Sequence, residues 1–200
     1  MTNYTTPAAS VAQRRSVPLA AWAAEEINWE GIDAVVLFTL EDKALRRSLH
    51  RLDKLELSDI RVITEKALLK HMHARPEAIA PLLLHKRLLE GLSGESLLLS
   101  SSMFLNTLQE VEQFFHLSFK TIKSKLGRTL DTNASELAMR AARVTTAAAE
   151  VLGGFDAARR YLRTKNFALG GSTPLDLLRT AEGERLVMNE LQAQAEGGPL

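Results

Sequence analysis

The sequence predicts a mainly all-α fold, because helix boundary signals recur along the chain in regular order. The C-terminal third shows them most densely. Gly153-Gly154 supplies the residues that end one helix, and residues 155, 158 and 162 form one apolar face of the next. Thr173-Pro174 opens a further helix with an N-cap and a proline at the first helical position. Gly183 is expected to break the chain again before a last helix over residues 184–194.

The middle of the chain is punctuated in the same way. Helices are expected over residues 93–104, 108–115, 119–126 and 134–152. Thr107-x-x-Glu110 is a capping box for the second of these, and Ser118 is the N-cap of the third.

The N-terminal region is predicted to be helical with up to two short strands. Residues 1–16 have no periodicity and are expected to be a flexible tail. Pro18 is predicted to open a helix that ends at Gly31, with its apolar face formed by Leu19, Trp22, Ala23 and Ile27. The run at 34–40 fits either a strand or a buried helix start. Ile60–Ile63 alternates like a strand before a Thr64 N-cap, and a helix is expected to start at Pro76 and to be disturbed at Pro81.

Composition excludes several classes of protein. The 200 residues carry a formal charge of +1 and include no cysteine, which excludes a disulfide framework, a thiolate zinc site and a cysteine nucleophile. His71 and His73 lie roughly 200° apart on a helix, which is poor geometry for one metal ion. No stretch approaches the ~20 apolar residues that cross a bilayer. We therefore expect a soluble, cytoplasmic protein that is not an enzyme and has no metal or cofactor.

Residues 108–126 form a candidate helix-turn-helix. Its second helix turns Phe119, Ile122 and Leu126 inward, and four basic residues and no acid lie between Ser118 and Arg128. Lysine and hydroxyl side chains are the types that contact phosphates and base edges. The predicted DNA-binding residues are Ser118, Lys120, Thr121, Lys123, Ser124 and Lys125. The alternative is a solvated, lysine-rich helix in a unit that does not bind DNA.

The long helix over residues 134–152 carries a narrow apolar seam. Its members alternate at spacings of four and three, as in helices that pair with a second helix. We expect this seam to form a homodimer, because it is too long and narrow to be filled within one chain. The residues are Leu137, Ala141, Val144, Ala148 and Val151.

The pattern A-x-x-x-L-R-T-x-N-x-x-L-G-G-x-T-P-L-D-L-L-x-T-x-x-G, from Ala158 to Gly183, resembles the toxin-binding domain of Xre/MbcA/ParS-type antitoxins. Upstream, Glu90-Gly91-Leu92, Leu117-Ser118 with Thr121-Ile122, and Ser135-Glu136 are similar to that family's helix-turn-helix and connecting helix. The resemblance covers residues 88–198. It implies four regions, namely a tail (1–16), an N-terminal helical region of unknown role (17–87), a DNA-binding unit (88–133) and a linking helix with a toxin-binding domain (134–200).

The resemblance implies an antitoxin of a type II toxin–antitoxin pair. Such a protein would bind a RES-fold toxin, an enzyme that consumes NAD or transfers ADP-ribose from it, and would repress its own operon by binding operator DNA. The implied toxin-binding residues are Asn166, Leu169, Gly170, Gly171, Pro174, Leu175, Leu178, Arg179 and Arg185.

Two alternatives stay open. Leu175, Leu178, Val187 and Leu191 could simply close a small helical core, although three short helices bury little surface alone. The chain could also be a free-standing helix-turn-helix regulator or partition-type DNA-binding protein without a toxin. Lysines stand where the family usually has arginines, which favours backbone contacts over base-specific ones.

Overall fold

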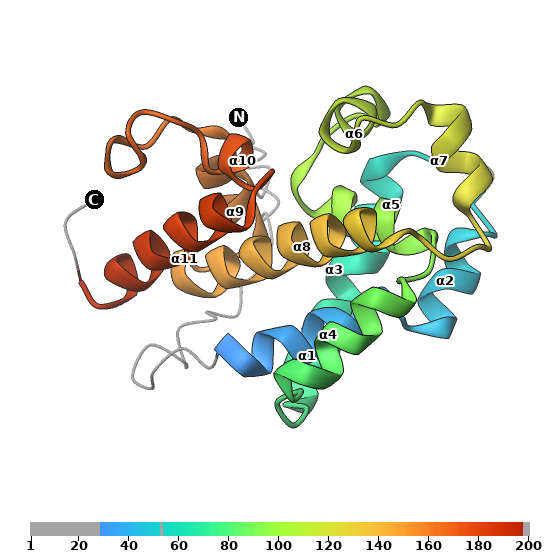
Figure 1. Cartoon of the computed structure of the whole chain (residues 1–200), viewed down its shortest axis with the longest axis horizontal. Coiled ribbons are helices and arrows are strands. Elements are labelled where there is room, and N and C mark those ends of the chain that lie inside the picture. The colour runs from blue at the N-terminus through green and yellow to red at the C-terminus, as the bar shows by residue number, and fades with distance from the viewer. Residues whose placement is uncertain (1–28, 53, 198–200) are drawn as a thin grey trace, which may run out of the picture.

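The computed structural model describes residues 29–52 and 54–197, and these residues form an all-α fold (Figure 1). The predicted tail and the helix face over residues 19–27 lie outside them. Within the described residues there is no strand, and no helix is long and apolar enough to cross a membrane. The elements are α1 (Trp29–Leu40), α2 (Lys43–Leu49), α3 (Leu57–Ala74), α4 (Pro81–Glu90), α5 (Glu95–Phe104), α6 (Leu108–Phe115), α7 (Phe119–Lys125), α8 (Thr132–Leu152), α9 (Phe155–Arg163), the 3-10 turn η2 (Phe167–Leu169), α10 (Pro174–Leu177) and α11 (Ala181–Ala195).

Two helices, α5 and α8, organise the core. Every residue of α5 is buried, and it packs against α1, α3, α8 and α9. Its buried serines remain hydrogen-bonded. Ser100, Ser101 and Ser102 donate to carbonyl oxygens one turn back, as Ser101 does to Leu97 at 2.6 Å, and Ser96 donates to the carbonyl oxygen of Leu40 in α1. α8 crosses the molecule from the α6–α7 pair to α9–α11 and contacts all three of α1, α5 and α11 (Figure 1).

Neither candidate strand forms, and for residues 34–40 the alternative of a buried helix is the correct one. Residues 34–40 belong to α1 and are almost entirely buried, so the β-branched run is a core helix. Ile60–Ile63 and Thr64 all lie inside α3, where the Thr64 hydroxyl donates to the Ile60 carbonyl instead of capping a helix. Gly31 likewise lies within α1 and does not end a helix. Burial on several sides overrides the local preference for extended backbone in these segments.

Pro81, and not Pro76, starts a helix. Pro81 occupies the first position of α4, where its missing N–H has no intrahelical partner to lose. Residues 75–80 form the link from α3, which ends at Arg75 in the left-handed conformation.

The seam of α8 is filled by the chain's own helices. Ala141, Val144 and Ala148 are fully buried, against α1, α5, α9 and α11. Leu137 and Val151 are partly buried against the same core. The prediction that one chain cannot fill this seam is therefore wrong. Its small alanine side chains let several helices approach α8 closely.

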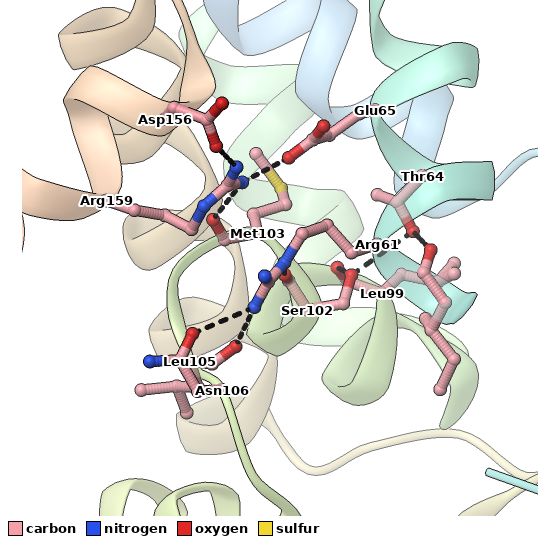
Figure 2. A network of polar contacts seen from close by, with 11 residues as sticks. Arg61, Thr64, Glu65, Leu99, Ser102, Met103, Leu105, Asn106, Asp156 and Arg159 are labelled. Carbon is pink, nitrogen blue, oxygen red and sulfur yellow. Dashed lines mark hydrogen bonds and ion pairs between the residues drawn. The ribbon is translucent and has the colours of Figure 1, made fainter. Parts of the chain in front are cut away.

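Two arginines, one in α3 and one in α9, tie the N-terminal region to the centre of the molecule (Figure 2). Arg61 of α3 donates to the carbonyl oxygens of Ser102 (2.8 Å) and Leu105 (2.6 Å), so it caps the end of α5. Arg159 of α9 binds Glu65 of α3 and reaches toward the end of α5. Arg61 and Glu65 of α3 thus hold the end of α5, just before α6, and the position of α9. The sequence had predicted no role for this region.

Glu150 of α8 gives the fold a testable pH dependence. Burial raises its pKa from the ordinary 4.5 to about 7. Between those two values the folded chain holds a proton at Glu150 that the unfolded chain has lost, so stability falls as pH rises. We expect Glu150→Gln to remove about 2 kcal/mol of the loss in unfolding free energy between about pH 5 and pH 8. Denaturant unfolding of both proteins at the two pH values measures it, and equal losses would contradict the assignment.

Candidate functional site

The C-terminal helices are positioned by two glycines and a buried face. Gly153, with φ 83°, ends α8 in the left-handed conformation that glycine adopts without a steric cost. The next helix, α9, then turns Phe155, Ala158 and Leu162 into the core, as the i, i+3, i+7 spacing predicts. Arg163 at its end makes a bidentate pair with Glu110 of α6 at 2.7 and 3.0 Å.

The loop over residues 166–172 is closed by hydrogen bonds around Asn166. Its Oδ1 accepts from the N–H of Ala168 (2.8 Å), and its carbonyl oxygen accepts from Gly171 (2.9 Å). Its Nδ2 donates to Glu190 of α11 at 3.0 Å. Gly170 and Gly171 both have positive φ, 66° and 78°, which favours glycine at both positions. The loop is therefore held in one conformation and anchored to α11.

This loop presents Phe167 to solvent. The side chain is 98% exposed although its backbone is held in η2. Leu186, 42% exposed, lies one helical turn before Glu190 on the same side of α11. The two apolar side chains therefore flank the contact between Asn166 and Glu190. The sequence patterns predicted a role for neither of them.

Glu190 is the polar hub beneath this surface. It accepts from the hydroxyl of Tyr161 as well as from Asn166 and Gln194. Burial and the bond to Glu190 raise the pKa of Tyr161, so its hydroxyl remains a donor. The loop, α9 and α11 consequently behave as one unit.

The start of α10 follows the sequence prediction. Thr173 caps α10 by accepting from the N–H of Asp176 at 3.2 Å, and Pro174 stands at the first position. The prediction that Gly183 breaks the chain is wrong. Thr180 caps α11, and Gly183 lies in the first turn of that helix. Glycine is needed there because a Cβ would stand 1.9 Å from the carbonyl oxygen of Leu177.

The predicted toxin-binding residues divide by exposure. Gly170, Gly171, Arg179 and Arg185 are exposed, and Asn166, Leu169 and Leu175 are partly buried. Pro174 is buried and Leu178 is fully buried, so both residues were wrongly placed in a contact surface. They belong to the core that α10 and α11 build on α8. The expectation that this region buries its own apolar side chains poorly is wrong for the same reason.

The helix-turn-helix candidate has the predicted local geometry. Helices α6 and α7 meet at a short turn in which His116 is left-handed, and Thr107 and Ser118 cap the two helices. Ile122 is buried, whereas Phe119 and Leu126 are partly buried. Lys120, Lys123 and Ser124 are exposed, which leaves two lysines of α7 free of the core.

Other predicted DNA-binding groups have partners within the chain. Ser118 and Thr121 share a hydrogen bond at 2.9 Å beside the Ser118 cap. Lys125 pairs with Asp131 at 3.1 Å. The two histidines that the sequence analysis judged poorly placed for one metal ion contact different groups, His71 the hydroxyl of Thr39 and His73 the carbonyl oxygen of Leu69.

Two contacts join α6 to the C-terminal helices. Besides the Arg163–Glu110 pair, Arg179 lies 3.2 Å from the Nε2 atom of His116. Arg163 holds the pKa of Glu110 below its ordinary value, against the opposing effect of burial. The capping residue Glu110 is thus also the residue that binds α9.

Comparison with known proteins decides the nature of the C-terminal region. Residues 147–197 match the family model of the antitoxin Xre/MbcA/ParS C-terminal toxin-binding domain. The resemblance carried by the 158–183 pattern is confirmed. The toxin-binding domain so defined is about a quarter of the chain and contains the last turn of α8, α9, the Phe167 loop, α10 and α11. No curated protein shows significant similarity to the chain.

The match supports an antitoxin role, and a toxin-binding domain implies a toxin as partner. A domain that acts by binding also favours a protein that is not an enzyme. The match does not extend to α6 and α7.

Proposed function

We propose that this protein is the antitoxin of a type II toxin–antitoxin pair, which binds and neutralises a RES-type toxin that consumes NAD or transfers ADP-ribose. The observation that carries the proposal is the toxin-binding domain at residues 147–197. The loop at its surface is preorganised, which lowers the entropy lost on binding. Phe167 supplies the kind of exposed aromatic anchor that fills a pocket on a partner.

The charges near this loop suit a toxin that uses an anionic dinucleotide. Lys165 is exposed directly before Asn166, and Arg179 and Arg185 are exposed on the following segments. Arg185 is already paired with Glu182 at 2.5 Å, so Lys165 and Arg179 are the stronger candidates to approach the toxin's active site.

Co-expression with the product of an adjacent RES-type gene tests the proposal. The full chain should restore growth of cells that express the toxin and should co-purify with it. The full chain is preferable to one truncated after residue 153, because truncation would remove Leu162, Leu178 and Leu191 from the core that covers α8. A chain that retains no such toxin would instead be a free-standing regulator.

We also propose that α7 enters the major groove of operator DNA and that the antitoxin represses its own operon. The support is the capped α6–α7 geometry and the exposure of Lys120 and Lys123. Helix-turn-helix proteins bind two half-sites as dimers. Because the α8 seam is buried, a homodimer would have to use another surface.

Replacing Lys120, Lys123 and Lys125 by alanine tests the proposed binding of DNA by α7. Each lysine that binds a phosphate should contribute roughly 0.9 to the slope of log affinity against log salt. We expect the fall in slope to be closer to the contribution of two lysines than to that of three, because Lys125 is already paired with Asp131. Unchanged binding by a folded variant would remove α7 from the interface.

A further inference from the structure

An open pocket of about 480 Å³ lies between α2, the segment that joins α4 to α5, and the loop that follows α7. Its walls carry Lys43, Arg46 and Arg47 from α2, Arg87 from α4 and Arg128 from the loop after α7. These residues are up to 85 positions apart in the sequence (43 to 128) and are gathered only by the fold. The resulting pocket is strongly basic.

The acid that lines this pocket, Glu95, is already hydrogen-bonded within the chain. The carboxylate of Glu95 is nearly buried and accepts from His50 (2.7 Å) and from the N–H of Gly127 (2.8 Å). Burial raises the pKa of Glu95, but its hydrogen bonds to backbone N–H groups and to His50 outweigh burial and hold that pKa below its ordinary value. Glu95 therefore stays charged and is used to hold α2 against the loop after α7.

Of the cations in the pocket walls, Arg87 has acidic partners among the described residues and the others do not. Arg87 is bound by Glu41 (2.7 Å) and Glu90 (3.0 Å). Within residues 29–52 and 54–197, Lys43, Arg46, Arg47 and Arg128 have no acidic partner. Four such cations around one open pocket create a positive potential that attracts an anion.

The pocket adjoins the end of α7. The N–H of Gly94 donates to the carbonyl oxygen of Arg128 at 2.7 Å, and Leu130 donates to Leu92 at 2.8 Å. These bonds hold the loop after α7 against the start of α5, so Arg128 has a fixed place. Figure 1 shows α2 and α7 at the same end of the molecule.

We propose that Lys43, Arg46, Arg47 and Arg128 bind backbone phosphates of the DNA that α7 enters. The inference rests on the proposed DNA binding and extends it to the N-terminal region. Guanidinium groups suit phosphate because they donate in a bidentate fork, and contacts of this type fix a protein's register on the duplex. Apart from His50 and Glu95, which bind each other, the pocket is lined by cations and small residues. The described residues that line it include no Phe, Tyr or Trp ring on which a base could stack, which favours a backbone phosphate over a free nucleotide.

The test compares two variants of the full chain. In the first, Lys43→Gln, Arg46→Gln and Arg47→Gln remove three charges from the pocket. The matched control carries Lys66→Gln, Lys70→Gln and Arg160→Gln, which remove three exposed cations outside it. Glutamine preserves helix propensity in both. Circular dichroism verifies that each variant is folded.

Binding is measured by fluorescence anisotropy with a mixed-sequence duplex of about 30 base pairs, at several salt concentrations. The pocket variant should lower the salt slope by roughly 2 to 3 units and weaken binding at least about tenfold near 0.1 M salt. The control should keep the wild-type slope. A pocket variant with the wild-type slope overturns the inference. So does a result in which ATP displaces the labelled duplex as well as unlabelled duplex does at the same phosphate concentration.

The alanine variant at Lys120, Lys123 and Lys125 separates this inference from the proposed function. If that variant loses affinity while the pocket variant does not, α7 binds DNA and the pocket does not. If the pocket variant alone loses affinity, the phosphate site stands and the role of α7 falls. A wild-type chain that binds no duplex overturns both.

Discussion

Replacing Phe167 by aspartate should abolish neutralisation of the toxin and leave the antitoxin folded. The phenyl ring is 98% exposed, so the variant leaves the core intact, and the loop is still held by Asn166, Gly170 and Gly171. An aromatic anchor at the centre of an interface contributes about 2 to 4 kcal/mol, so toxin affinity should fall roughly 30- to 1000-fold. Calorimetry with the purified toxin and rescue of growth both measure the effect.

Val62→Asp is the matched control for this experiment. Val62 is 67% exposed on α3, so the same change from an apolar side chain to a carboxylate is made outside the toxin-binding domain. The control should neutralise toxin like the wild type. Full protection by Phe167→Asp would show that the loop at residues 166–172 does not bind the toxin.

Capping signals in the sequence predicted the starts of α6, α7 and α10 correctly. Thr107, Ser118 and Thr173 each accept from the backbone N–H three residues ahead, and such a bond needs nothing beyond its own segment. The paired glycines at 170 and 171 likewise adopt positive φ for local reasons. The pattern that carries the confirmed resemblance, residues 158–183, lies within the matched residues 147–197.

Periodicity predicted which residues are apolar on one face but not what covers that face. The α8 seam and Leu178 were both predicted to lie in contact surfaces, whereas α1, α5, α9 and α11 bury them within the chain. Conversely, Phe167 stands outside any helical stripe, between a cap residue and two glycines. That isolation was the one sequence signal that it is exposed.

The basic pocket could not be predicted from the sequence. Lys43, Arg46 and Arg47 belong to a region that the resemblance does not reach. Arg128, just after α7, lies 81 residues beyond Arg47 in the sequence. The contacts of Glu95 with His50 and Gly127 help to bring the two segments together in the folded chain. In the sequence alone, the basic residues of α2 and those near the end of α7 are two separate clusters of charge.

Gly94→Ala should have the largest effect on the proposed DNA-binding unit. The φ of Gly94 is −59°, which any residue adopts, so the position needs glycine for space alone. A Cβ there would stand 1.8 Å from the carbonyl oxygen of Lys125 and 2.5 Å from its carbonyl carbon. Because both are backbone atoms, the end of α7 must move away, and the bond from Gly94 to Arg128 must break. We expect a loss of about 3 kcal/mol or more in unfolding free energy.

The same displacement should remove DNA binding in the variant that remains folded, because it moves α7 and Arg128 together. Gly127→Ala is the control on the other side of the contact. Gly127 has φ 74° with open space around its Cβ, so alanine there meets only backbone strain, about 1 to 2 kcal/mol, without pushing α7 away. Denaturant unfolding and anisotropy on the same samples, at a temperature where both variants are folded, compare the two effects. If Gly94→Ala is as stable as Gly127→Ala and binds duplex equally well, α7 is not held at Gly94, and the loop that carries Arg128 is not fixed beside α2.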